Sequence, residues 1–310
     1  MALAVPLSRF TPRVGGGSAF FVRRSCVYPM NQAEPSPNLP PLAKCVPGIA
    51  QSLALCGLYW GVSIAVTIAL LLLQRFANVP MSSGWVQLVI AWPLTFWVGL
   101  RWSKVSFRQA CPLTRFPVRI VPALLIASFG VIILVNAAAS LIPRPEAPLI
   151  IPLPEALTKK DMSESMAGSS KLALFFSSFF SDVLVAPLAE EFFFRGLVLR
   201  GYLGRYSMTK AAWASAVFFA VFHLNPWQAV VVLLPGLGFT WLFLRTGSLV
   251  PGILSHATVN FSVSFLLALG YDLEASHCPP SLLAIAGAMA GIGGFFLWRQ
   301  LAKPPNERSA

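Results

Sequence analysis

Residues 119–142 read RIVPALLIASFGVIILVNAAASLI, and no charged residue follows Arg119 in this run. About 20 consecutive apolar residues, wound as an α-helix, cross the roughly 30 Å hydrocarbon layer of a bilayer. The whole chain has the same character, because 56% of its 310 residues are hydrophobic and only 11% are charged. A water-soluble surface needs about 25–35% charged residues. Lipid is therefore expected to be the main solvent of this protein.

Similar apolar runs, separated by charged residues or by Pro and Gly, recur along the chain. They predict an all-α fold, a polytopic transmembrane helical bundle with about eight membrane-spanning helices. The expected spans are 48–74, 82–100, 119–142, 171–200, 210–224, 227–244, 248–270 and 281–299. The span at 210–224 is short, so we expect it to be tilted or shielded by its neighbours.

The spans and the segments between them divide the chain into four regions. Residues 1–47 are basic and then proline-rich, which indicates a disordered or targeting leader, or a start codon assigned too early with Met30 as the true start. Residues 48–170 hold N-terminal membrane helices and one long exoplasmic loop, 143–170. Residues 171–300 form the helical bundle that carries the candidate site described below. Residues 301–310 are a short polar tail.

Basic residues lie mainly in short loops beside the apolar runs, although the net charge of +12 could also suggest a nucleic-acid ligand. The insertion rules of membrane proteins and lipid headgroups explain this placement better, so we expect lipid and no nucleic acid as a partner. The loop 101–119 has five cations and no acid. Both termini are thus expected in the cytoplasm, or in the stroma if the protein is imported into a plastid. Five scattered cysteines without a CxxC pair indicate neither a disulfide framework nor a zinc ribbon.

Three apolar spans contain residues that are costly in lipid. The sequences are PLAEEFFFRG at 187–196, FFAVFHLNP at 218–226 and LSHATVNFS at 254–262. Ionisable groups at membrane depth usually have a function. At a helical rise of 1.5 Å per residue, Glu190, His223 and His256 lie roughly 16–22 Å from the cations that mark the cytoplasmic ends of their helices. This similar depth predicts a single site.

Helical spacing assigns directions to these side chains. Glu191 and Arg195 are four residues apart and share a face, so we expect an ion pair between them. Glu190 points about 100° away and stays free to react. His256 and Asn260 are also four residues apart and project together. Asp182, two turns before Glu190, is read as polar lining.

These residues can hydrolyse an amide. A buried carboxylate beside an imidazole can take a proton from water, and a His with an Asn can donate to the oxyanion that forms. The alternative is a zinc site made by Glu190, His223 and His256. Because the sequence has no HExxH and an Asn260 amide is a poor zinc ligand, we favour metal-free water activation and expect no cofactor.

The patterns EExxxR at 190–195, FxxxH at 219–223 and HxxxN at 256–260 resemble the CAAX protease and bacteriocin-processing (CPBP) family, which includes type II CAAX prenyl endopeptidases. This resemblance implies an intramembrane endopeptidase. Glu190 and His223 would activate water, while His256 and Asn260 would form the oxyanion pocket. The substrate would be a peptide or protein, prenylated or not.

Two other classes of function remain open at this stage. One is a non-catalytic membrane protein of the binding or immunity type that retains the fold, and the other is a transporter with a proton relay. No motif residue is missing, which favours the enzyme over the first. A transporter would be expected to show inverted repeats, and the two halves of the sequence show none.

Overall fold

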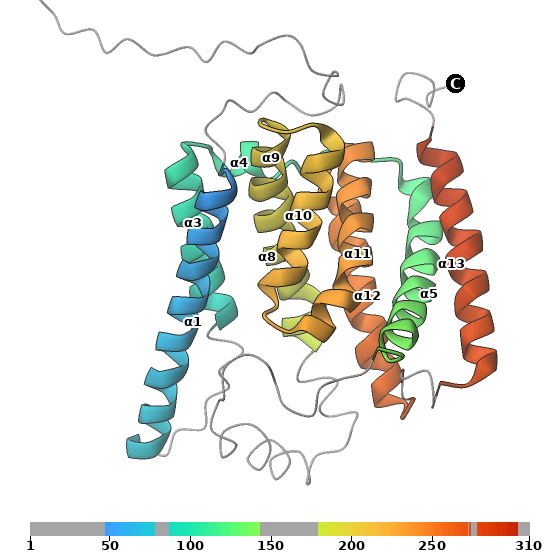
Figure 1. The fold of residues 1–310 in the computed structure, drawn as a ribbon, viewed down its shortest axis with the longest axis horizontal. Coiled ribbons are helices and arrows are strands. Elements are labelled where there is room, and N and C mark those ends of the chain that lie inside the picture. The colour runs from blue at the N-terminus through green and yellow to red at the C-terminus, as the bar shows by residue number, and fades with distance from the viewer. Residues whose placement is uncertain (1–46, 78–86, 143–178, 272, 274–277, 303–310) are drawn as a thin grey trace, which may run out of the picture. The chain divides into compact units, whose positions relative to one another are not determined.

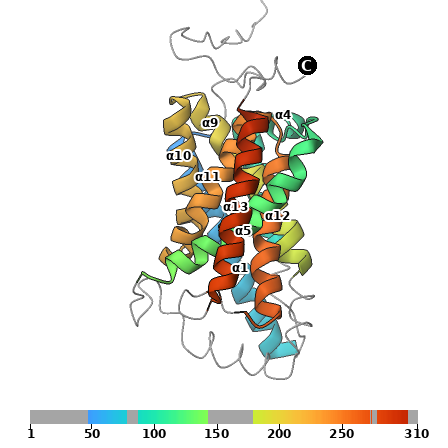
Figure 2. The same ribbon diagram turned by 90° about the vertical axis from the view of Figure 1, so that its right-hand side faces the viewer.

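The computed structural model describes residues 47–77, 87–142, 179–271, 273 and 278–302, and these residues form helices without any strand. The predicted leader, the predicted exoplasmic loop and the predicted polar tail lie almost wholly outside the described residues. Figures 1 and 2 show the described helices running roughly parallel to one another. The all-α fold class is therefore confirmed.

The helices coincide with the predicted apolar runs. They are α1 (Ile49–Ala77), η1 (Gln87–Ala91) leading into α3 (Trp92–Ser103), α4 (Phe107–Ala110), η2 (Val118–Ile120) leading into α5 (Val121–Ala139), the continuous run η4 (Phe179–Val185), α8 (Ala186–Glu191), η5 (Phe192–Leu199) and α9 (Arg200–Leu203), then α10 (Met208–Phe222), α11 (Pro226–Thr246), α12 (Val250–Ala268) and α13 (Pro280–Leu301). Of these, η1, η4 and η5 are π-helical and η2 is a 3₁₀-helix.

Five helices in the described part of the chain are long and apolar enough to cross a membrane: Ile49–Leu70, Val118–Ala139, Pro226–Thr246, Val250–Ala268 and Pro280–Leu301. The prediction of about eight spans is not confirmed. Helix α10 has only 15 residues, and the runs 87–103 and 179–203 are divided among shorter α and π segments. Large apolar side chains such as Phe76, Val118 and Leu141 are more than 70% exposed, as expected for lipid contact. The chain is an integral membrane protein.

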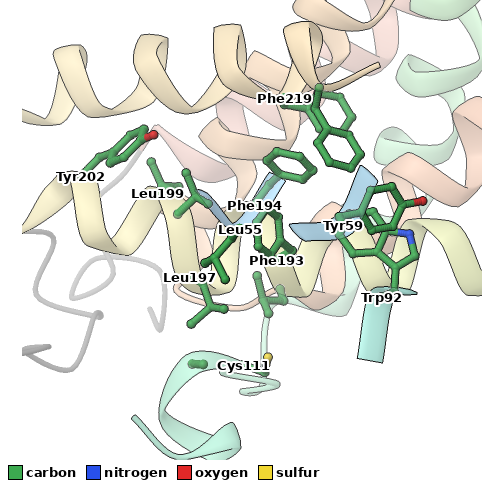
Figure 3. Packing of buried hydrophobic residues seen from close by; sticks show 14 of the residues in the cluster. Leu55, Tyr59, Trp92, Cys111, Phe193, Phe194, Leu197, Leu199, Tyr202 and Phe219 are labelled. Carbon is green, nitrogen blue, oxygen red and sulfur yellow. The ribbon is translucent and has the colours of Figure 1, made fainter. Parts of the chain in front are cut away.

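The largest buried cluster surrounds the run 179–203. Phe193 and Phe194 are fully buried, and their rings lie 5.6 Å from Trp92 of α3 and 5.0 Å from Phe219 of α10, respectively. Figure 3 shows these aromatic rings gathered around η5. The indole of Trp60 in α1 donates to the carbonyl oxygen of Phe222 at 3.2 Å. Helices α1 and α3 thus support the two segments that carry the first and second motifs.

Close packing of α5 against α13 depends on one glycine from each helix. A Cβ atom at Gly130 would lie 2.4 Å from the carbonyl oxygen of Ala286, and one at Gly293 would lie 2.7 Å from the amide nitrogen of Ala127. The spacing of Gly287 and Gly291 also permits close packing, but nothing described lies within 4 Å of a Cβ at either position. Spacing alone does not say which face of a helix meets a neighbour.

Candidate active site

The predicted ion pair between Glu191 and Arg195 is present at the junction of α8 and η5. Nη1 of Arg195 donates to Oε1 of Glu191 at 2.8 Å, and both side chains are 0% exposed. A fully buried pair of this kind is stable only when further hydrogen bonds satisfy its remaining polar atoms. Both partners therefore need additional contacts from neighbouring helices.

Arg195 makes these contacts with α10 and α11. Its Nη2 donates to the carbonyl oxygen of Gly236 at 2.8 Å. The guanidinium carbon lies 4.6 Å from the ring centre of Phe219 and 5.2 Å from that of Phe239, which adds cation–π attraction on both sides. Arg195 thus fastens three helical segments together around the acid pair.

His256 lies between the two carboxylates. Its Nδ1 is 3.1 Å from Oε1 of Glu191, and its Nε2 is 3.8 Å from Oε2 of Glu190. Because an ionised carboxylate only accepts, Nδ1 carries the proton of this hydrogen bond. The imidazole also stacks on Phe239, with ring centres 4.7 Å apart and an angle of 19° between the planes. The sequence had assigned Glu191 to Arg195 alone, whereas the structure makes it the partner of His256 as well.

Glu190 differs from its neighbour in being only partly buried. Its side chain is 15% exposed, and its buried Oε2 has no hydrogen-bond partner in the described part of the chain. Oε2 of Glu191 also has no hydrogen-bond partner among the described residues, so the two adjacent acids differ in that Glu191 is fully buried and engaged twice through Oε1, whereas Glu190 is partly exposed.

His223 is the C-terminal cap of α10 and has a defined tautomer. Its Nδ1 lies 2.9 Å from the carbonyl oxygen of Phe219. A carbonyl only accepts, so Nδ1 is protonated and Nε2 of the neutral ring has a free lone pair. Leu224 follows with a φ of 51°, a left-handed conformation that ends the helix at the imidazole. No hydrogen bond or ion pair among the described residues joins His223 to Glu190 or to His256.

The ring of Phe219 connects the two histidines. It meets His223 edge to face with ring centres 5.0 Å apart, and it meets His256 in the same way at 5.8 Å. The four-residue spacing of Phe219 and His223 puts both on one face of α10, which explains the first of these contacts. The sequence did not show that the same ring also packs against His256 and Arg195.

Within the described ranges, no hydrogen bond joins Asn260 to Glu190, His223 or His256. Its Nδ2 donates to the backbone carbonyl of Asp182 at 2.7 Å, which joins α12 to η4. The HxxxN spacing still puts Asn260 one helical turn beyond His256 on the same side of α12. An amide nitrogen has two protons, so one of them is available to a further acceptor.

Three residues of this site were not singled out as functional from the sequence. Gly236 supplies the carbonyl that Arg195 needs, Phe239 stacks on His256, and Gly252 of α12 leaves room for the carboxylate of Glu191. A Cβ at Gly252 would lie 3.0 Å from Oε2 of Glu191. The Pro-Gly pairs at 235–236 and 251–252 signal close approach of backbones, but they do not identify what approaches.

Substitution of Gly236 by Ala is expected to destabilise the protein by about 1–3 kcal/mol, the usual cost of overpacking a core. The new Cβ would lie 2.9 Å from Cδ1 of Phe219 and 3.5 Å from Nη2 of Arg195. Gly238→Ala is the matched control, because nothing described lies within 4 Å of its Cβ position. Thermal unfolding in detergent measures both. Equal melting temperatures for the two variants would contradict the tight fit around Arg195.

The alternative zinc set of Glu190, His223 and His256 does not come together as a metal site. No group of three His, Cys, Asp or Glu side chains within the described ranges could hold a metal ion. Both nitrogens of His256 face carboxylates, and His223 is separated from it by the ring of Phe219.

Comparison with known proteins agrees with the motifs. Residues 172–262 match the family described as Type II CAAX prenyl endopeptidase Rce1-like. No curated protein and no solved structure matches the chain. The matched segment contains the EExxxR, FxxxH and HxxxN patterns. It therefore includes Glu190, Glu191, Arg195 and His256, which lie together in the site. The resemblance inferred from these motifs is therefore confirmed over residues 172–262, which match a protease family.

Proposed function

We propose that this protein is an intramembrane endopeptidase that hydrolyses a peptide bond with water activated by Glu190 and His223. The observation that carries the proposal is the position of His256 between two carboxylates, 3.1 Å from Glu191 and 3.8 Å from Glu190. This cluster lies in the segment that matches a protease family. Because the site is in a membrane bundle, the substrate is a membrane-associated peptide or protein, prenylated or not.

The cluster offers two acceptors for a proton of water. Oε2 of Glu190 has no hydrogen-bond partner in the described part of the chain. The lone pair on Nε2 of His223 is the second acceptor.

The same hydrogen bonds explain how His256 can stabilise an oxyanion. Its Nδ1–H donates to Glu191, so Nε2 can donate only after the ring takes a second proton. That proton is the one removed from water, passed from Oε2 of Glu190 to Nε2 of His256, which lie 3.8 Å apart. Hydroxide adds to the carbonyl carbon, and protonated His256 and Asn260 donate to the oxygen as negative charge develops. The carbon–nitrogen bond then breaks, and the same proton moves from His256 to the leaving amine.

The function is tested in a strain that lacks the gene. We expect membrane proteins to accumulate as longer precursors in the null strain and in a Glu190→Ala strain, and to be processed again when the wild-type gene is restored. Quantitative mass spectrometry of membrane fractions measures precursors and new N-termini. Absence of any precursor common to both strains would contradict the proposal.

Metal-free hydrolysis predicts that a strong chelator leaves the purified protein active. No cofactor is assigned to the site, because its residues already provide a base and two oxyanion donors. Cleavage of an identified substrate should continue in detergent after dialysis against the chelator, and elemental analysis should give substoichiometric zinc. Activity that is lost to the chelator and restored by zinc would instead make Glu190, His223 and His256 metal ligands.

We also place both termini on the cytoplasmic side, or on the stromal side of a plastid membrane, from the positive charge of the loop 101–119. Lys104, in the turn after α3, should then be protected from a membrane-impermeant amine reagent in intact cells. If Lys104 is labelled from outside, the loop 101–119 lies on the outer side of the membrane and the proposed orientation is wrong.

A further inference from the structure

A polar cavity of about 440 Å³ adjoins the candidate active site. Its walls come from α5, η4, α11, α12 and the turn before α11. The polar residues that line it are Asn136, Asp182, Asn225, Gln228, Asn260 and Ser264. Four of these six polar residues carry side-chain amides, which can pair with the N–H and C=O groups of an extended peptide, while the rest of the lining, outside these six, is apolar.

The cavity borders all three motif-bearing segments. Asn260 is itself a candidate oxyanion donor. Asn225 follows His223 by two residues, and Asp182 precedes Glu190 by eight residues along one continuous helical run. A peptide whose scissile carbonyl lies at His256 and Asn260 would therefore extend into this cavity.

Asp182 is the only acidic residue that lines the cavity within the described ranges, and its charge has no cationic partner there. Its Oδ1 accepts a hydrogen bond from the hydroxyl of Ser181 at 2.7 Å, and its backbone carbonyl accepts from Asn260. No described Lys, Arg or His forms an ion pair with it. The side chain is exposed. A carboxylate in a membrane helix usually pairs with another group, so Asp182 is poised to receive a cation from a ligand.

We propose that this cavity binds the substrate segment next to the cleaved bond and that Asp182 selects a Lys or Arg side chain in that segment. The inference rests on the proposed endopeptidase function and adds a substrate preference to it. Glu190 is eight positions after Asp182, which corresponds to roughly 12 Å at the rise of an α-helix. An extended chain covers 3.3–3.6 Å per residue, so the basic residue lies within about four residues of the cleaved bond.

The experiment uses the full-length protein in its native membrane. Cut sites are first defined as new N-termini that are present with the wild type and absent in both the null and the Glu190→Ala strains. Lys or Arg should be enriched at one position within about four residues of these sites. Strains producing Asp182→Asn, Asp182→Glu and Asp182→Lys are then compared by the ratio of product to precursor, normalised to the abundance of each variant.

Processing at basic sites should fall by up to about fivefold with Asp182→Asn, because a charge pair made by an exposed side chain is weak. Asp182→Glu should retain most of the activity. A substrate in which the basic residue is replaced by Glu should be processed better by Asp182→Lys than by the wild type. A merely structural role of Asp182 would not produce this reversal.

Two results would overturn the inference while leaving the proposed function intact. The cut sites could lack any enrichment of Lys or Arg, or Asp182→Asn could process basic sites at the wild-type rate. Complete absence of sites that depend on Glu190 would overturn the proposed function itself, and the inference with it. The two failures are therefore distinguishable.

Discussion

Replacing Glu190 by Gln is expected to lower the rate of peptide cleavage by about 10²–10⁴-fold, the usual contribution of a general base. Gln keeps the shape of the side chain but cannot accept a proton from water. The fold should persist, because Oε2 of Glu190 has no hydrogen bond in the described part of the chain and lies 3.8 Å from His256. The measurements are cleavage of an identified substrate by purified protein and thermal unfolding of the same sample.

A folded Glu190→Gln variant that cleaves at the wild-type rate would refute both the metal-free scheme and the zinc alternative, since each depends on this carboxylate. A variant that loses activity together with its folded state would place Glu190 among the structural residues. The expected result is loss of cleavage with a nearly unchanged melting temperature.

Glu191→Gln is expected to destabilise the folded protein by about 3–5 kcal/mol, the cost of leaving one member of a buried ion pair without its partner. Oε1 of Glu191 accepts from both Arg195 and His256. The neutral amide removes the charge that balances Arg195, which is 0% exposed. Thermal unfolding in detergent and abundance in the membrane measure the effect.

The adjacent substitution Glu190→Gln is the matched control, because it removes the same charge one position away. The expected order is a large drop in melting temperature for Glu191→Gln and a small one for Glu190→Gln. Equal melting temperatures would contradict the assignment of a structural role to Glu191 and a catalytic role to Glu190. Full activity of Glu191→Gln would show that the bond to His256 is not needed to orient the imidazole.

Local patterns were sufficient for the fold class and for the ion pair. Runs of about 20 apolar residues predicted the long helices, and a four-residue spacing predicted that Glu191 and Arg195 meet. Both features depend on periodicity within one helix. The number of spans was less secure, because the run 179–203 is apolar in sequence but combines π and α segments with buried charges.

Contacts between helices could not be read from the same patterns. The spacing of His256 and Asn260 predicted a shared face, yet the hydrogen bonds of these two residues go to Glu191 and to the backbone of Asp182. Gly287 and Gly291 had the spacing of a packing motif, whereas Gly130 and Gly293 make the close approach. Which neighbour a helical face meets depends on the rotation and position of both helices.

By itself, the sequence determined that this chain forms apolar helices of membrane-spanning length, which follows from composition and from the 3.6-residue period along a single segment. The resemblance to a protease family rests instead on the three motifs, and residues 172–262 match that family. The similar depth of the polar groups stays a prediction. Only the tertiary structure placed His256 between two carboxylates and Phe219 between two histidines. It also formed the cavity that Asp182 lines. Each of these arrangements joins residues more than 25 positions apart in the chain or on different helices. Their distances are set by the packing of side chains from several helices at once.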